Sequence, residues 1–167
     1  MDSLSIYLTA RYQKRPNPRS AGSIIGRATI AGTCIEYDMA QPYGCASLTL
    51  AELNTLFLSL HTIDPVYTDS NIEIVHDCQS ISKITEKTSL GEYKSKPIQN
   101  SDLVKQIRDL ISKFPNLTIG YTKEPNANID RASKLALESA VSQIRNNLHP
   151  KGTTNGPSPE RFCSKNK

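Results

Sequence analysis

The hydrophobic pattern of this chain changes its period near Leu50, and that change limits the folds it can adopt. Three earlier segments are rich in apolar and β-branched side chains typical of strands: Ser5–Thr9, Ser23–Ile30 and Thr33–Met39. Leucines and a phenylalanine then recur at three and four residues: Leu50, Leu53, Leu56, Phe57 and Leu60. The pattern predicts three antiparallel strands followed by a helix with one buried face.

The remaining segments alternate between the two kinds of element. Strand patterns cover Asn71–His76 and Leu117–Tyr121, and helix patterns cover Gln79–Ile84, Asp102–Phe114 and Ile129–Leu148. This order predicts an α/β fold in which a mixed sheet, three antiparallel strands and then parallel ones, carries packed helices. We expect one domain over residues 1–149 and a disordered basic tail over 150–167, because the tail is polar, rich in Gly, Pro and Ser, and without periodicity.

Composition excludes several classes of protein. The four cysteines form no CxxC pair and have no histidine at ligand spacing, which argues against a zinc site or a thioredoxin-like centre. No apolar run approaches membrane-spanning length, so we expect an intracellular, cytoplasmic protein without a membrane partner. The net charge of +4 is compatible with a polyanionic partner. Nothing in the sequence indicates an oligomeric state.

Three acidic residues stand next to predicted element boundaries, and each has a local explanation. Glu52 ends a capping-box sequence that begins at Thr49. Asp77 follows a strand and precedes a short helix, where it suits an N-cap. Asp130 falls in the first turn of the last helix, where a negative charge favours the helix dipole. Taken singly, these residues therefore do not indicate a catalytic site.

Taken together, four segments around these acids resemble the type I ribonuclease H family. They are TLAELNTLFLSL with Glu52, IEIVHDCQS with Asp77 and Gln79, KPIQNSDLVKQIRDLI, and NLTIGYTKEPNANIDRASKLA with Asp130. Their order and spacing agree with the family from about Ser5 to Ala140. The resemblance implies a ribonuclease H-like fold in which Glu52, Asp77 and Asp130 are catalytic, metal-binding acids. It implies Mg²⁺ or Mn²⁺ as the cofactor if the protein is active, and otherwise none.

The first strand departs from the family. Relatives carry an Asp there, ahead of a Pro-containing loop, whereas this strand reads IYLTARYQKRPNP. Aligning the prolines places Thr9 at the Asp position, and aligning the strand alone allows Ala10. Neither side chain replaces a carboxylate. Two Mg²⁺ ions clamped by clustered carboxylates stabilise phosphodiester hydrolysis, so losing a shared ligand should lower the rate by orders of magnitude.

Basic and polar side chains suggest where nucleic acid would bind. Arg11, Lys14, Arg15 and Arg19 form the densest positive run of the sequence, as expected for phosphate contacts, although a solvated loop would look the same. The resemblance adds Lys94 and Lys96 in the region of the basic protrusion. It also adds Ser47, Thr49 and Gln79 as candidates for sugar or base contacts in a minor groove.

Three functional hypotheses follow, and the chain's status as an enzyme stays open among them. The first is a ribonuclease H-like protein that binds an RNA–DNA hybrid or double-stranded RNA, with hydrolysis lost or strongly reduced. The second is an active, divalent-metal-dependent ribonuclease H that cleaves the RNA strand of a hybrid. The third is a non-catalytic protein-interaction module.

Overall fold

The computed structural model describes residues 2–14, 18–44, 46–96 and 99–148. The predicted tail at 150–167 lies outside these residues. The sheet consists of β1 (Ser3–Gln13), β2 (Arg19–Ile30), β3 (Thr33–Pro42), β4 (Asn71–His76) and β5 (Leu117–Tyr121). The helices are α1 (Leu48–His61), the short 3₁₀ helix η1 (Pro65–Tyr67), α2 (Gln79–Thr85), α3 (Ser101–Ile111) and α4 (Ala127–Leu148).

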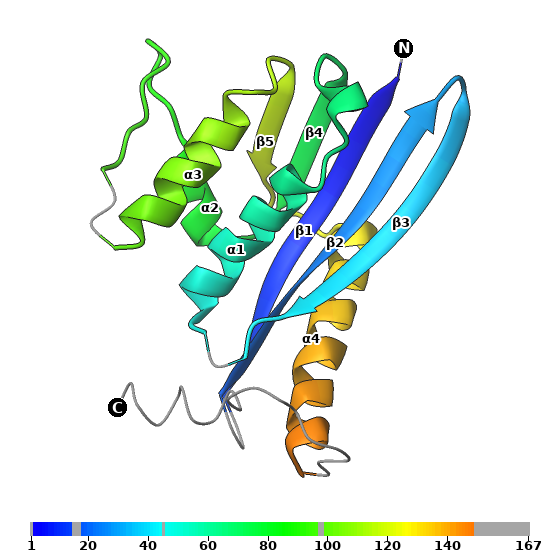
Figure 1. Cartoon of the computed structure of the whole chain (residues 1–167), viewed down its shortest axis with the longest axis vertical. Helices are drawn as coiled ribbons and strands as arrows, with labels where there is room; N and C mark the ends of the chain where they lie inside the picture. The colour runs from blue at the N-terminus through cyan, green and yellow to red at the C-terminus, as the bar shows by residue number, and fades with distance from the viewer. Residues whose placement is uncertain (1, 15–17, 45, 97–98, 149–167) are drawn as a thin grey trace.

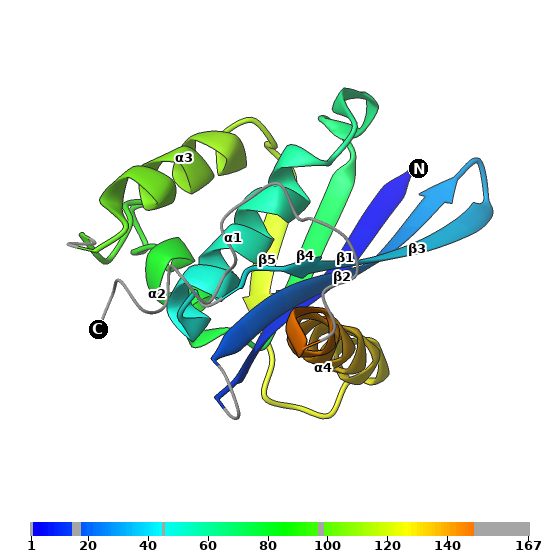
Figure 2. The same ribbon diagram turned by 60° about the horizontal axis from the view of Figure 1, so that its bottom comes forward.

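The five strands form one mixed sheet in the order β3-β2-β1-β4-β5. The first three strands pair antiparallel, and β4 and β5 add in parallel beside the central β1. This confirms the predicted topology. Helices cover both faces: α1, α2 and α3 lie on one side of the sheet and α4 crosses the other (Figures 1 and 2).

The two faces of β1 are chemically different. Its apolar side chains Leu4, Ile6 and Leu8 join Leu53 and Leu56 of α1 in the main core. Beneath α4 the packing uses small residues instead, and Ala21 of β2 meets Ala136 and Ala140. Because successive strand residues alternate between faces, Thr9 and Arg11 lie on the α4 side, whereas Ala10 shares the α1 side with Leu8.

The first strand is longer than predicted at both ends. Pairing with β2 continues from Thr9↔Ser23 through Arg11↔Ala21 to Gln13↔Arg19. The polar stretch after Thr9 therefore extends the ladder, where the pattern suggested a turn. As a result, β1 runs past its last partner on β4, the pair Leu8↔His76, and carries Arg11 to the end of the sheet.

Among the helices of the described residues, none is long and apolar enough to cross a membrane.

Candidate functional site

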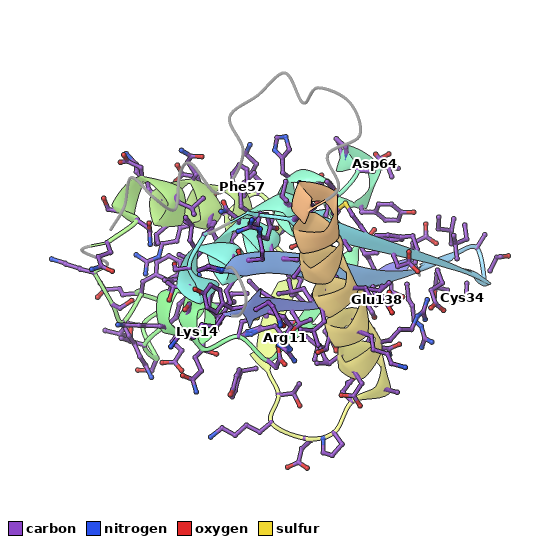
Figure 3. All side chains as sticks on the ribbon, turned by 90° about the horizontal axis from the view of Figure 1, so that it is seen from below. Arg11, Lys14, Cys34, Phe57, Asp64 and Glu138 are labelled. Carbon is purple, nitrogen blue, oxygen red and sulfur yellow. The ribbon has the colours of Figure 1, made fainter. Side chains whose placement is uncertain are left out.

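A cavity of about 530 Å³ opens where β1, β4 and β5 end beside the start of α1. It is lined by Ala10, Arg11, Tyr12, Leu48, Glu52, Asp77, Cys78, Gln79 and Tyr121. The chain thus brings together Glu52, Asp77 and Gln79 from three separate predicted elements, with Arg11 beside them. Figure 3 views the side chains from this end of the molecule.

Asp77 follows β4 directly, and both of its carboxylate oxygens accept hydrogen bonds from β1. Thr9 Oγ1 donates to Oδ1 at 2.7 Å, and Arg11 Nη2 donates to Oδ2 at 2.8 Å in an ion pair. The N-cap of α2 is Cys78, whose own side chain makes no capping hydrogen bond. The N-cap explanation for Asp77 is therefore wrong, because its carboxylate faces β1.

The capping-box explanation for Glu52 is also wrong. The N-cap of α1 is Ser47, whose hydroxyl accepts from the Leu50 amide, so Thr49 does not begin a capping box. Glu52 lies on the buried side of α1, 7% exposed, and its Oε2 accepts from the Ser80 amide at 3.1 Å. The carboxylate therefore reaches across to the start of α2 and the edge of the cavity.

Arg11 is bound by three parts of the fold. Nη1 donates to Thr9 Oγ1 at 2.6 Å and to the Ala10 carbonyl at 2.9 Å, Nη2 donates to Asp77, and Nε donates to Ser133 Oγ of α4 at 2.8 Å. The side chain remains 33% exposed. The guanidinium is thus fixed in place while one side of it faces the cavity.

The strand geometry distinguishes the two β1 positions, Thr9 and Ala10, that the resemblance aligns with an acid. Ala10 lines the cavity with Glu52 and Asp77, and its side chain is almost fully buried. Thr9 is fully buried and does not line the cavity, although it bonds Asp77. Of the two aligned positions, Ala10 is the one from which a carboxylate would enter the cavity.

Asp130 is exposed in the first turn of α4 and does not line the cavity. It precedes Ser133, the residue that holds Arg11, by one helical turn. The helix itself is capped by Asn126, whose Oδ1 accepts from the amides of Asn128 and Ile129. The structure therefore brings Glu52 and Asp77 together and leaves Asp130 at the periphery.

The two acids of the cavity shift their pKa values in opposite directions. Burial raises the pKa of Glu52, the Ser80 hydrogen bond opposes this, and the charge of Asp77 adds to the rise. Burial alone would also raise the pKa of Asp77, but the bonds from Arg11 and Thr9 outweigh it, and the pKa is lowered. Asp77 is therefore held ionised by a cation that belongs to the protein.

This donor set does not fit a pair of divalent ions. Both oxygens of Asp77 already accept protein hydrogen bonds, and Ala10 offers no ligand. Within the residues that the structure describes, no group of three or more His, Cys, Asp or Glu side chains is placed to hold a metal ion. Mg²⁺ in proteins is usually held by one or two carboxylates together with water and substrate phosphates, and here Thr9 and Arg11 occupy both oxygens of Asp77.

The predicted basic run is split by the fold. Lys14 is exposed directly after the end of β1 and is labelled in Figure 3. Arg19 is fully buried at the start of β2, and its Nη1 donates to the Pro18 carbonyl at 2.7 Å. This burial gives no support to a nucleic-acid contact by Arg19, which stays a prediction. Arg15 lies outside the described residues.

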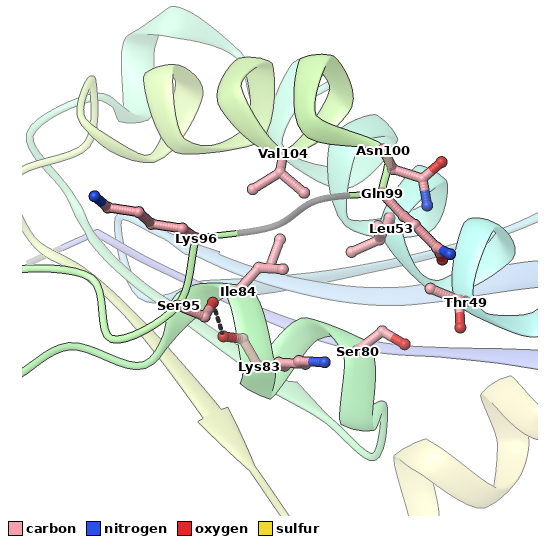
Figure 4. A pocket seen from close by; sticks show the side chains of 10 residues that line it. All are labelled: Thr49, Leu53, Ser80, Lys83, Ile84, Ser95, Lys96, Gln99, Asn100 and Val104. Carbon is pink, nitrogen blue, oxygen red and sulfur yellow. Dashed lines mark hydrogen bonds between the residues drawn. The ribbon is translucent and has the colours of Figure 1, made fainter.

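A second cavity of about 530 Å³ lies between α1, α2 and the segment before α3. Its floor is apolar, with Leu53, Ile84 and Val104, and its rim carries Thr49, Ser80, Lys83, Ser95, Lys96, Gln99 and Asn100 (Figure 4). Lys94 is exposed close by, and its amide donates to the Glu86 carbonyl. Thr49 and Lys96 thus share a rim, whereas Gln79 lines the main cavity and Ser47 is the N-cap of α1.

Three residues that form or support the main cavity escaped sequence reasoning. Tyr121 lines the cavity, whereas Ser133 and Ser80 lie outside its lining and hold Arg11 and Glu52 in place. Ser133 and Tyr121 carry no pattern that singles them out, and Ser80 contributes only a backbone amide. For Arg11 a signal existed: it stands two residues after Thr9 on a strand, so both share one face. Its basic character alone suggested a phosphate contact, whereas its partner Asp77 comes from the adjacent parallel strand.

Comparisons with solved structures identify the fold. RNase H1 from the halophilic archaeon Halobacterium salinarum superposes with a TM-score of 0.60 at 19% identity, over 84% of this chain and 98% of that one. The RNase H domain of PFV gives 0.62 at 16% identity, over 83% and 94%. No protein-family model and no curated sequence matches the chain.

Complexes with nucleic acid are among the similar structures. LC11-RNase H1 in complex with an RNA/DNA hybrid gives a TM-score of 0.61 at 18% identity, over 84% of this chain and 99% of that one. The chain therefore has an RNase H-like α/β fold, as the resemblance predicted. At these identities the likeness establishes the fold, and the activity has to be argued from the residues of the site.

Proposed function

We propose that this RNase H-like chain binds duplex nucleic acid, an RNA–DNA hybrid or double-stranded RNA, and that its capacity for hydrolysis is lost or strongly reduced. The fold supports the binding half, since a structure of the same fold is a complex with an RNA/DNA hybrid. The observation that carries the second half is the occupation of Asp77 by Arg11 and Thr9 beside Ala10.

The chemistry of the site favours holding over cutting. Hydrolysis by two metal ions needs carboxylates that hold the ions against the attacking and leaving oxygens. Here the positive charge of Arg11 balances the negative charge of Asp77, and burial raises the pKa of Glu52. A guanidinium binds a phosphate through charge-assisted hydrogen bonds but does not generate hydroxide from water. The cavity can therefore accept a phosphodiester without activating a nucleophile.

The contacts to the duplex would come from two neighbouring regions. Arg11 and Lys14 would face phosphates at the main cavity, with Gln79 on its rim. Ser47 and Thr49 at the start of α1 would lie between this cavity and the lysines Lys94 and Lys96. Phosphate contacts fix the position of the duplex, and side chains at a minor groove read its A-form shape.

An active, Mg²⁺- or Mn²⁺-dependent ribonuclease H is the second candidate. One observation favours it, because Glu52 and Asp77 meet at the same cavity. For such an enzyme to work, Arg11 would have to leave Asp77 when metal and substrate bind, and Asp130 would have to approach from α4.

Labelled hybrid and double-stranded RNA, incubated with the wild type, Thr9→Asp and Ala10→Asp in Mg²⁺ and in Mn²⁺, separate the candidates. We expect retention of duplex without cleavage by the wild type. Strong wild-type cleavage that disappears in Asp77→Asn would favour the active enzyme. Absence of salt-sensitive retention would exclude nucleic-acid binding and favour an interaction module.

A further inference from the structure

The disagreement between this site and a divalent ion points to a specific replacement. We propose that the guanidinium of Arg11 is a built-in cation that takes the place of a metal ion between the acids and the phosphodiester backbone. Binding of duplex at this cavity would then need no divalent metal, and Mg²⁺ or Mn²⁺ would be excluded from Asp77. The first part rests on the proposed function, and the second does not.

The anchoring of Arg11 supports a permanent position. Its four hydrogen bonds reach Thr9 and Ala10 on β1, Asp77 at the end of β4 and Ser133 on α4. Thr9 Oγ1 accepts from Arg11 and donates to Asp77, so the three side chains form a closed ring of bonds. A planar guanidinium fixed at several donors keeps its direction.

The charges support the replacement as well. Asp77 and Glu52 line the same cavity, and the negative charge of each disfavours ionisation of the other. Arg11 supplies one positive charge at 2.8 Å from Asp77. An arginine stays protonated under all ordinary conditions and cannot be removed by a chelator. The site therefore carries its own counter-charge.

A divalent ion would meet two obstacles. To coordinate Asp77 it would have to displace the hydrogen bonds of Thr9 and Arg11, and it would then lie against a guanidinium of like charge. A phosphate meets the opposite situation, because Arg11 is 33% exposed toward a cavity that admits it. The same geometry thus obstructs a metal ion at Asp77 and leaves part of the Arg11 guanidinium open to a phosphodiester.

The first test measures hybrid affinity of the full chain in EDTA and in Mg²⁺ at matched ionic strength. We expect equal affinities, within about twofold, and a loss of about tenfold in Arg11→Met, which removes one charge-assisted contact. Arg131→Met is the control, since Arg131 is an exposed arginine of α4 that pairs with Glu36 and Asp38 of β3. Affinity that requires Mg²⁺, or an Arg11→Met variant that binds like Arg131→Met, would overturn the inference.

The second test measures Mn²⁺ binding by calorimetry without nucleic acid. Neither the wild type nor Ala10→Asp should bind Mn²⁺ at this site, because Arg11 remains. The double variant Ala10→Asp/Arg11→Ser should gain Mn²⁺ binding that disappears when Asp77→Asn is added. Mn²⁺ binding by the wild type that Asp77→Asn abolishes would refute metal exclusion.

The two tests also separate the inference from the proposed function. A wild type that retains no duplex under any condition would contradict the proposed function and the phosphate role of Arg11 together. Metal exclusion would still be decided by the Mn²⁺ titration, because that measurement uses no nucleic acid.

Discussion

Arg11 Nη2 donates to Asp77 Oδ2 at 2.8 Å and joins the end of β1 to the end of β4 where the main cavity opens. The pair is partly buried, with side chains 33% and 22% exposed. It relates two residues 66 positions apart in the sequence. The electrostatics of the candidate site depend on this contact.

Breaking this pair should destabilise the fold. We expect Asp77→Asn and Arg11→Met each to lower the free energy of unfolding by about 1–3 kcal/mol, because each leaves a half-buried polar or charged partner. In a double-mutant cycle measured by urea unfolding, the double variant should lose less unfolding free energy than the sum of the losses in the two single variants. Strict additivity would show that the contact contributes nothing.

Tight packing of α1 against β2 should make Gly22 intolerant of a side chain. A Cβ at this position would lie 1.8 Å from Thr55 Oγ1, whose own hydroxyl donates to the Ala51 carbonyl. Gly22→Ala should therefore cost about 1–3 kcal/mol of unfolding free energy. Gly120→Ala on β5 is the matched control, since a Cβ there meets nothing within 4 Å. Equal unfolding free energies for the two variants would contradict this packing.

Stability should fall in mild acid because of His76. Burial lowers the pKa of this nearly inaccessible histidine to about 4, from an ordinary 6.5. At a pH between these two values, His76 binds a proton in the unfolded chain but not in the folded chain. Stability is therefore lost as pH falls from about 6.5 to 4. The loss should be about 2–4 kcal/mol for this group.

The carboxylates of Asp77 and Glu52 also change the stability of the fold with pH, in opposite directions. The lowered pKa of Asp77 gives stability that is lost only below its unfolded value, and the raised pKa of Glu52 returns some stability as the pH falls. Unfolding by urea at pH 7 and at pH 4.5 should therefore show a net loss that is smaller in His76→Gln. A loss of the same size in that variant would assign the effect elsewhere.

Lys14 should contribute to nucleic-acid affinity without affecting the fold. Its side chain is exposed beyond β1, so Lys14→Gln should weaken hybrid binding and reduce the slope of log affinity against log salt by about 1. Lys113→Gln is the control, because Lys113 is an exposed lysine at the opposite end of the sheet, between α3 and β5 (Figure 1). Identical salt slopes for both variants would place the duplex elsewhere.

The fold was largely predictable because periodicity reports which face of an element is buried. The change near Leu50 located the switch from strands to α1, and the later patterns found β4, β5 and α4. Element ends were harder to predict. The residues after Thr9 are polar, yet they continue the ladder with β2, since backbone pairing there does not depend on apolar side chains.

The site was predictable only in part, because its bonds join distant segments. Local patterns offered caps for Glu52 and Asp77, but these acids accept from Ser80, Thr9 and Arg11 across the fold. Arg19 looked like part of a basic loop, and only the three-dimensional packing shows that it is buried. Conversely, the family resemblance placed Glu52 and Asp77 at one site, which the structure brings together.

Retention and cleavage measured on one labelled RNA–DNA hybrid test whether this chain holds duplex nucleic acid without cutting it. The wild type in Mg²⁺ should retain the hybrid with a salt-dependent affinity, equal to that in EDTA, and the RNA strand should remain intact. Metal-dependent cleavage of that strand, abolished by Asp77→Asn, would contradict the proposed function.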